Sequence, residues 1–311
     1  MILNDTAIAT LSEAIQKSEA SISSHWRVEF REFRQDQGGF VGVRVQGHTP
    51  RGGFARRIRH YALLTPFRRM GKRFANFDEY LRSGKTIAER RGGVLDLGMI
   101  RQVLTLSLLD QHVSAEQARL PTIIIGDGWG TMASLVLSSL PKRKVVLVNL
   151  TSMLLVDLVY IMKSFPGISI CLARDVSEYQ SGLECDGVDV VAVCADNAEI
   201  IGHGPIGVAI NIASMQEMDP LVIASYFEAL RSSPNPKTLF YCCNRIEKTL
   251  PDGTEVLFQE YPWRPEDKIL VDENCPWHQY YLRLRPPFQS RYDGPIWHRL
   301  AEIKKEQKYE A

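Results

Sequence analysis

The segment from Pro121 to Leu150 constrains the fold of this chain more than any other part. It begins with the apolar run Thr122–Ile125, passes through a turn with three glycines and an apolar stretch, and ends in the apolar run Val145–Leu150. Runs of Ile and Val that are bounded by turn residues are typical of strands buried on both faces. The segment therefore predicts a strand, a turn, a helix and a second strand, which is the opening unit of a Rossmann-like α/β domain.

The turn reads Gly126-Asp127-Gly128-Trp129-Gly130. Glycines at alternate positions allow a tight turn in which a ligand approaches the backbone. A dinucleotide fingerprint would place its third glycine at Thr131, and no basic residue follows directly as in a P-loop. Asn149 and Leu150 end the second run about 20 residues later, where nucleotide-binding folds place a ribose contact. We therefore expect these residues to form a nucleotide-type cofactor site, and the alternative is a purely structural turn.

Composition limits the class of protein. The chain has 311 residues, 45% of them hydrophobic, and a net charge of +1. This balance gives no argument for binding nucleic acid or an anionic membrane. The 6 cysteines form no Cys-x-x-Cys pair, which favours buried thiols in a reducing compartment over disulfides or a zinc site. With no secretory signal and no apolar run long enough for a membrane span, we expect a soluble cytoplasmic protein.

The front third of the chain shows mainly helical patterns. Helices are predicted at Met1–Glu19, at Phe77–Leu81, at Ile87–Arg91 and from Gly93 through Leu108, and the alternation of Val41, Val43 and Val45 predicts a strand or an extended arm. The composition changes near residues 115–121, where the sheet-like runs begin. We therefore predict a mainly helical N-terminal module over residues 1–118 and a Rossmann-like domain over residues 119–311.

An arginine-rich stretch runs from Phe54 to Phe74, with aromatic residues and leucines between the basic ones. It could bind phosphate groups of a substrate or an acidic partner. The alternative is a solvated helix face whose charges pair with acids elsewhere, and the near-zero net charge favours this alternative.

Further strands are predicted beyond the second run. They lie at Ile168–Leu172, Val188–Ala195, Val208–Ile212 and Thr238–Cys243, with Ile269–Val271 and Tyr280–Leu284 expected to close the sheet as an antiparallel pair and Ile296–Lys308 expected to be a terminal helix. Ligand groups collect at the carboxyl ends of strands in such a sheet. Asp196 is therefore a candidate adenine contact, and a turn aspartate is the alternative.

A polar motif follows the strand Val208–Ile212. Asn211 lies near the carboxyl end of that strand, and Ser214 and Glu217 have the spacing of a capping box. Glu217 thus has a structural role available, which is to cap the helix predicted at Leu221–Arg231.

Several segments together resemble the sugar O-methyltransferases, a bacterial group with the class I S-adenosylmethionine-dependent methyltransferase fold. The resemblance covers roughly residues 122–287 and rests on five segments: Ile125–Gly130, Asn211 with Ser214–Met218, Phe240–Asn244, Tyr261–Trp263 and Lys268–Pro276. It implies a cofactor, S-adenosyl-L-methionine, and an enzyme that methylates a sugar hydroxyl during polysaccharide or glycosylated metabolite biosynthesis. The chain departs from the family's usual acids at Ile124 and Asn149.

The resemblance also orders the candidate residues. It implies that Asn211 and Ser214 face the cofactor together with the glycine turn, and that Asp127 partly compensates for a positive group of the cofactor. A base for the acceptor hydroxyl should be His, Asp or Glu. The candidates are Glu217, His203 and His278, although a lone histidine is more often structural. No tight Asp/Glu/His cluster requires a catalytic metal.

We expect a small-molecule or glycan acceptor, no nucleic-acid partner and no membrane span, and homo-oligomerisation stays open. Two other functions stay open as well. A non-catalytic binding or scaffold protein with a degenerate methyltransferase fold would account for Ile124 and Asn149. An NAD-dependent oxidoreductase is disfavoured by Thr131 in place of the third glycine and by the missing acid at Asn149.

Overall fold

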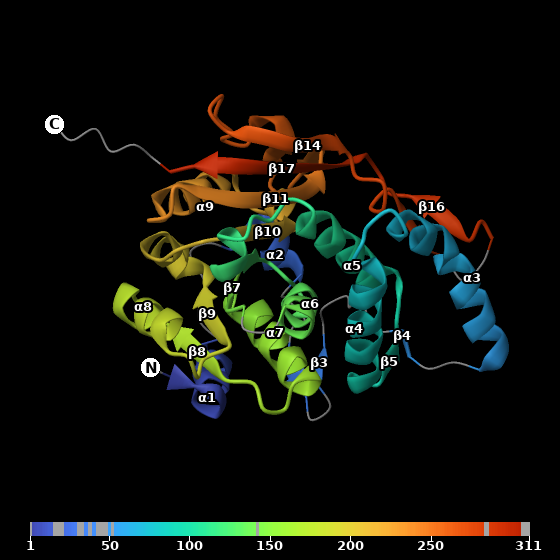
Figure 1. Ribbon diagram of the computed structural model, residues 1–311, viewed down its shortest axis with the longest axis horizontal. Coiled ribbons are helices and arrows are strands. Elements are labelled where there is room, and N and C mark those ends of the chain that lie inside the picture. The colour runs from blue at the N-terminus through green and yellow to red at the C-terminus, as the bar shows by residue number, and fades with distance from the viewer. Residues whose placement is uncertain are drawn as a thin grey trace.

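The computed structural model describes residues 2–14, 22–29, 34–36, 39–41, 49–50, 53–140, 143–282 and 286–305. Its centre is a nine-stranded sheet in the order β1-β8-β9-β7-β6-β10-β11-β17-β14 (Figure 1). The strands are β1 (Ile2–Leu3), β6 (Thr122–Ile125), β7 (Val145–Asn149), β8 (Ile170–Ala173), β9 (Val190–Cys194), β10 (Val208–Ile212), β11 (Lys237–Arg245), β14 (Lys268–Asn274) and β17 (Ile296–Lys304). The six strands from β8 to β11 run parallel, while β1 and β17 are antiparallel to their neighbours. The predicted Rossmann-like α/β fold is therefore confirmed.

The direction in which the chain builds the sheet reverses beside β6. From β6 the chain continues through β7, β8 and β9 on one side, and it then returns to the other side of β6 as β10 and β11. Ligands of open α/β sheets bind outside the carboxyl ends of the strands at such a switch point. The turn at Gly126 and the turn after Ile212 both leave the sheet at this place.

Helices cover both faces of the sheet, because parallel strands are apolar on both sides. One apolar core packs against α1 (Asn4–Ala14), α3 (Phe54–Gly71), α4 (Phe77–Arg90), α5 (Leu97–Asp110), α6 (Thr131–Ser139) and α7 (Thr151–Ser164). The other core packs against α8 (Val176–Glu184), the 3-10 segment η3 (Ala195–His203) and α9 (Pro220–Ser232). Figure 1 shows α8 and α9 to the left of the strands and α4 to α7 to the right.

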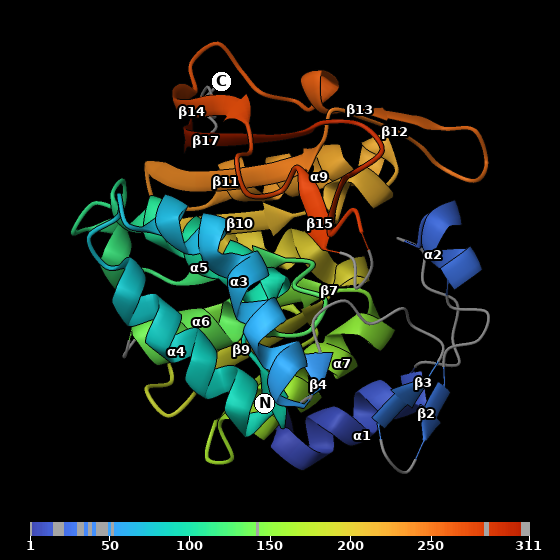
Figure 2. The ribbon, with the colours of Figure 1, turned by 90° about the vertical axis from the view of Figure 1, so that its right-hand side faces the viewer.

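The remaining elements are short. They are the helix α2 (Ser24–Glu29), the paired strands β2 (Arg34–Asp36) and β3 (Gly39–Val41), β4 (Thr49–Pro50) and β5 (Gly93–Val94), β12 (Glu247–Thr249) and β13 (Glu255–Leu257), β15 (Tyr280–Leu282) and β16 (Gln289–Arg291), and the 3-10 turns η2 (Gln117–Arg119), η4 (Met215–Glu217) and η5 (Phe258–Glu260). Figure 2 shows α2 on the side of the molecule that also carries β12 and β13.

The C-terminal part differs from the sequence-based prediction. Ile296–Lys304 is not a helix but the strand β17, which lies between β11 and β14. Tyr280–Leu282 pairs with β16 and not with the main sheet, and residues 283–285 lie outside the described part. Successive residues of β17 are buried in opposite cores. Leu300 lies in the core on one face of the sheet, and Ala301 lies in the core on the other face. A strand with both faces buried has no visible two-residue alternation, so its sequence pattern does not distinguish it from a helix.

The N-terminal elements take part in the sheet layer. β1 pairs with β8, and α1 packs against α7 and β8. The two short helices predicted over residues 77–91 are the single helix α4, and of the predicted strand at residues 41–45 only Val41, in β3, is described. The division near residue 118 stays a prediction. Among the described residues, no helix is both long and apolar enough to cross a bilayer.

The described part of the arginine-rich stretch lies on α3 and the turn after it. Arg68 stacks over the ring of Tyr61, 4.0 Å from its centroid. Lys72 pairs with Asp78 at 2.7 Å. The ion pair of Lys72 is of the kind expected for a face whose charges are locally paired, whereas Arg68 contacts an aromatic ring and not an acid. Arg51 lies outside the described residues, as do the side chains of residues 54–59.

Candidate functional site

A pocket opens at the carboxyl edge of the sheet, at the switch point beside β6. Its empty volume, with open solvent included, is ≈ 520 Å³. Six residues singled out from the sequence line it: Gly126, Gly128, Asn149, Leu150, Ser214 and Glu217. They come from three strand ends that are far apart in the sequence, so the fold brings the main predicted site residues together.

The three glycines of the turn serve different purposes. Their φ angles are +73° at Gly126, +81° at Gly128 and +56° at Gly130, in the left-handed region that favours glycine. A Cβ on Gly126 would collide with Ser214, and one on Gly130 would lie 2.6 Å from the backbone oxygen of Asp157. A Cβ on Gly128 would meet no atom of the described residues within 4 Å. Gly126 and Gly130 are therefore required by packing, whereas Gly128 leaves open space at the pocket.

Asp127 faces the helix that follows the turn. Its two carboxylate oxygens accept hydrogen bonds from the backbone nitrogens of Met132 at 2.9 Å and Ala133 at 2.8 Å. Burial raises the pKa of this carboxyl, while the bonds from Ala133 and Met132 and the charge of Arg91 oppose the rise. The carboxylate thus satisfies the free N–H groups at the start of α6, and Asp127 is not among the residues that line the pocket.

The side chain of Asn149 is hydrogen-bonded to a buried acid, Asp157, whose role was not predicted from the sequence. Its Nδ2 donates to Asp157 at 2.8 Å, and its Oδ1 accepts from the backbone nitrogen of Leu150 at 2.9 Å. Asp157, in α7, also accepts from the backbone nitrogen of Gly130 at 2.9 Å. Burial, followed by repulsion from Asp127, raises the pKa of Asp157 well above its ordinary value. The only available signal was a lone acid within an apolar helix.

Arg91, at the end of α4, holds the same turn from the other side. Its guanidinium donates to the oxygen of Gly130 at 3.0 Å and to the hydroxyls of Ser134 at 2.7 Å and Ser164 at 2.8 Å. Burial lowers its pKa to about 10, although the charges of Asp127 and Asp157 oppose this. The glycine turn is therefore fixed by residues from α4 and α7 together.

Asn211 supports the site without lining it. It is fully buried, and its Nδ2 donates to the oxygen of Ile125 at 3.0 Å, while its Oδ1 accepts from Asn244 at 2.8 Å. Ser214 donates its hydroxyl to the same Ile125 oxygen at 3.0 Å. Ala213, which lies between Asn211 and Ser214, has a positive φ of 59° that turns the chain sharply after β10. Asn211 thus ties the ends of β6, β10 and β11 together and places Ser214 at the pocket.

The predicted capping box at Ser214 and Glu217 is wrong. Residues Met215–Glu217 form only the 3-10 turn η4, and no side-chain hydrogen bond caps it. The hydroxyl of Ser214 is directed to Ile125 instead, and the next helix begins separately at Pro220. The structural role predicted for Glu217 is therefore absent, and its carboxylate is available for another use.

Glu217 lies at the centre of a small charged constellation at the pocket. Its carboxylate is 3.0 Å from the Nζ of Lys248, in β12, and 3.5 Å from the Nε2 of His25, in α2. Ser23 donates its hydroxyl to the backbone oxygen of Glu217 at 2.5 Å. The side chain of Glu217 is only 18% exposed. A carboxylate, an imidazole and an ammonium group thus meet at the pocket, and such groups can bind a hydroxyl and move its proton.

Four other predicted residues lie away from this pocket. His203 is exposed at the end of η3, on the side where β10 begins rather than ends. Asp196 is exposed, although its neighbour Ala195 lines the pocket. Trp129 packs edge-on against Tyr160, with ring centroids 4.6 Å apart. His278 is buried in the loop after β14 and does not line the pocket.

The N-terminal contribution to the pocket was not predicted from the sequence. Ser23, just before α2, and Trp26, within it, line the pocket together with Met153, Met218 and Tyr226. The one available signal was the Ser-His-Trp cluster at residues 24–26, which combines hydroxyl, imidazole and indole groups in a polar segment. Its place over the pocket depends on contacts with distant parts of the chain, such as that from Ser23 to Glu217.

Comparisons with known proteins give only distant likenesses. No protein-family model and no curated protein matches the sequence. Similar solved structures include magnesium protoporphyrin IX methyltransferase (ChlM) from Synechocystis PCC 6803 with bound SAH, at 12% identity and a TM-score of 0.40, covering 65% of this chain and 83% of that one. Cofactor-bound Rv0187 from MTB has 16% identity and a TM-score of 0.39, with 64% and 79% covered. The arsenic (III) S-adenosylmethionine methyltransferase CrArsM from Chlamydomonas reinhardtii has 12% identity and a TM-score of 0.35, with 61% and 64% covered. With identities and TM-scores this low, function has to follow from the geometry of the chain itself.

Proposed function

We propose that this protein is an S-adenosyl-L-methionine-dependent methyltransferase that methylates a hydroxyl group of a sugar or glycan acceptor. The observation that carries the proposal is the pocket at the switch point of the sheet. There the positive-φ Gly128 leaves open space, and Asn149 from the next strand lines the same pocket. A nucleoside cofactor with a charged tail fits such a pair of strand ends.

The residues of the pocket suit the parts of this cofactor. The turn at Gly128 exposes backbone to the amino-acid end, because no side chain of the described residues occupies the space beside it. Asn149 offers a polar group for the ribose hydroxyls, and Asp157 fixes its orientation. The apolar side chains of Leu150 and Met153 provide a wall for the adenine ring. When bound, the cofactor supplies an electrophilic methyl group on a sulfonium.

Glu217 and His25 act on the acceptor in this proposal. The acceptor hydroxyl donates a hydrogen bond to the carboxylate of Glu217, which lines the pocket. As the new carbon–oxygen bond forms and the carbon–sulfur bond breaks, the hydroxyl proton passes to the Glu217–His25 pair. Lys248 holds the carboxylate in place at 3.0 Å. Holding the acceptor in line with the methyl group supplies much of the acceleration.

The choice of a sugar as acceptor has separate support. It rests on the resemblance carried by Asn211, Ser214–Met218 and Phe240–Asn244. Around the pocket, the side chains of Glu217, Lys248 and Ser23 offer both donors and acceptors, as a polyhydroxylated ligand requires. We therefore expect sugars or glycans in polysaccharide or glycosylated metabolite biosynthesis to be methylated.

Calorimetric titration of the purified protein with S-adenosylhomocysteine tests the cofactor, with NAD as the control ligand. We expect micromolar binding of S-adenosylhomocysteine and none of NAD. Binding of NAD alone would replace the proposal with an oxidoreductase. Binding of neither ligand would favour a non-catalytic scaffold. Once cofactor binding is established, methyl transfer to a panel of sugars and nucleotide sugars tests the acceptor class.

A further inference from the structure

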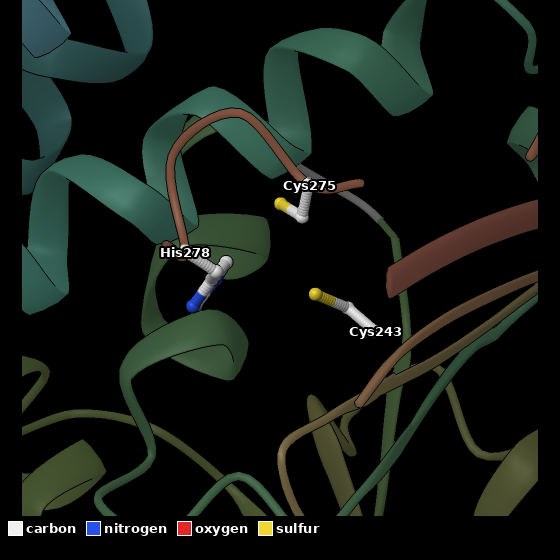
Figure 3. A group of neighbouring side chains, drawn as sticks. All are labelled: Cys243, Cys275 and His278. Atoms are coloured by element: carbon white, nitrogen blue, oxygen red, sulfur yellow. The ribbon is translucent and has the colours of Figure 1, made fainter. Parts of the chain in front are cut away.

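Two cysteines and a histidine meet in the core, away from the proposed cofactor pocket. Cys243 lies in β11, Cys275 directly follows β14, and His278 comes three residues later. One potential ligand atom from each residue lies within 4.8 Å of the others. Figure 3 shows both sulfur atoms directed toward the side on which His278 lies. Both cysteines are 0% exposed and His278 is 8% exposed.

These side chains have the chemistry of a zinc site. Thiolate sulfur and imidazole nitrogen are the usual ligands of structural Zn²⁺. With bonds of about 2.3 Å to sulfur and about 2.0 Å to nitrogen, the ligand atoms of a tetrahedral site lie about 3.5–3.8 Å apart. In the structure the three ligand atoms lie within 4.8 Å of one another. Their separations therefore need to shorten by only about 1 Å to match those of a tetrahedral zinc site.

His278 adds an independent reason to expect a ligand here. Its Nε2 is buried and has no hydrogen-bond partner within the described part of the chain. Buried polar atoms are rarely left without a partner, so each such atom calls for an explanation. A metal ion would provide one.

We propose that Cys243, Cys275 and His278 bind a Zn²⁺ ion that ties β11 to the loop after β14. His298, in β17, supports this site. It lies beside Cys275, and its Nδ1 lies 3.0 Å from the hydroxyl of Tyr241. Partners of this kind orient the ligands of metal sites.

The ion would have a structural role. Cys243 precedes Asn244, which holds Asn211 and the backbone nitrogen of Gln216 at the pocket edge. The opposite side of the site is the loop that joins β14 to β15. A bound ion would therefore fix the antiparallel edge of the sheet to the strand that supports the cofactor pocket. The site is independent of the proposed methyltransferase activity.

Titration of the full chain with Co²⁺ tests this site. The reduced protein is treated with a chelator, dialysed and titrated, and thiolate-to-cobalt charge transfer is followed in the near ultraviolet. We expect one Co²⁺ per chain, displaced by one Zn²⁺. Cys275→Ser and His278→Ala should lose this signal. Cys171→Ser should keep it, because Cys171 is equally buried at 0% exposure but lies in β8.

The outcomes separate a metal site from hydrogen-bonded thiols. Absence of the charge-transfer band in the folded, reduced wild-type protein would overturn the proposal, and this result does not depend on the folding of any variant. An undiminished band in a folded Cys275→Ser variant would overturn this location. Zinc bound to the protein as purified, at one ion per chain, and lost only from the ligand variants would support it.

Discussion

At the scale of single residues, Gly128 gives the sharpest test of the pocket. Its backbone is left-handed, but a Cβ there would contact no atom in the part of the chain that the structure describes. Gly128→Ala should therefore cost only the conformational strain of about 1 kcal/mol, while its methyl group enters the space assigned to the cofactor. We expect the affinity for S-adenosylhomocysteine to fall at least tenfold in calorimetric titration.

Gly294→Ala is the matched control for this substitution. Gly294 has a φ of +87°, and a methyl group added to it would also meet open space, but it lies in the turn before β17. The two variants should lose similar thermal stability, and only Gly128→Ala should lose cofactor affinity. Equal affinities for S-adenosylhomocysteine in both variants would show that the cofactor does not bind in this pocket.

Glu217 carries the second prediction at this scale. Glu217→Gln keeps the size of the side chain but removes the charge that faces His25 and Lys248. We expect kcat to fall about 100-fold, the usual size of an acid–base contribution, with little change in affinity for S-adenosylhomocysteine. Glu178→Gln is the control, because Glu178, on α8, is similarly enclosed, at 15% exposure, in an ion pair with Arg174. Unchanged turnover in Glu217→Gln would leave Glu217 with a structural role.

The site residues differ in how well the sequence predicted them. The glycine turn was predictable because its requirement is local, namely positive φ angles directly after a strand. Asn211 was correctly placed at a strand end, but its inward direction follows from the register that sets it opposite Ile125 in β6. Asp157 and His25 reach the site only through tertiary packing. No pattern around either residue encodes the partner that it contacts.

At the scale of elements, the parallel strands were predictable and the antiparallel edge was not. The strands from β6 to β11 stand out as apolar runs between turns, because both of their faces are buried. β17 is buried on both faces too, but its apolar residues are interrupted by His298, Arg299 and Glu302. The buried hydroxyl of Tyr241 accommodates His298, and Asp272 pairs with Arg299. Such pairings cannot be recognised before the strands are placed.

A buried ion pair holds α9 to the antiparallel edge and leads to a prediction about pH. Arg231 donates to Asp267 at 2.8 and 2.6 Å, and the two side chains are 3% and 0% exposed. Burial alone would raise the pKa of Asp267, but hydrogen bonds from Arg231 and the backbone of Arg264 outweigh it and lower the pKa. The unfolded chain therefore binds this proton more readily than the folded one. The stabilisation is present above about pH 4, the ordinary value for Asp, and is lost as pH falls through the lower folded value.

Asp267→Asn should lower the free energy of unfolding by about 3–5 kcal/mol at pH 7, because Arg231 keeps a buried charge without its partner. The difference from the wild type should shrink below about pH 4. Urea unfolding at several pH values measures both effects. The control is Asp272→Asn, which breaks a similar two-bond pair with Arg299 whose carboxylate is 34% exposed. It should cost about 1 kcal/mol or less, and equal losses in the two variants would contradict this account.

At the scale of the whole molecule, the front of the chain and the α/β part share one apolar core. Phe77 of α4 and Val103 of α5 belong to the same buried cluster as Ile124 of β6 and Tyr241 of β11. Ser23 and Trp26 line the proposed cofactor pocket. Arg91 fixes the glycine turn through Gly130. Stability and the shape of the proposed cofactor pocket therefore both depend on residues before position 118.

This dependence predicts the behaviour of a fragment comprising residues 119–311. Without the front helices, it exposes the apolar face that α5 covers in the full chain, and it lacks Arg91. We expect the fragment to aggregate or to unfold without a cooperative transition, and not to bind S-adenosylhomocysteine. The full chain should unfold in one transition. At a concentration of 100 times its dissociation constant, S-adenosylhomocysteine should stabilise the full chain by about 2.7 kcal/mol and shift this transition to higher temperature. Calorimetry of both proteins decides the matter, since a cooperative, ligand-binding fragment would show that the α/β part folds and functions alone.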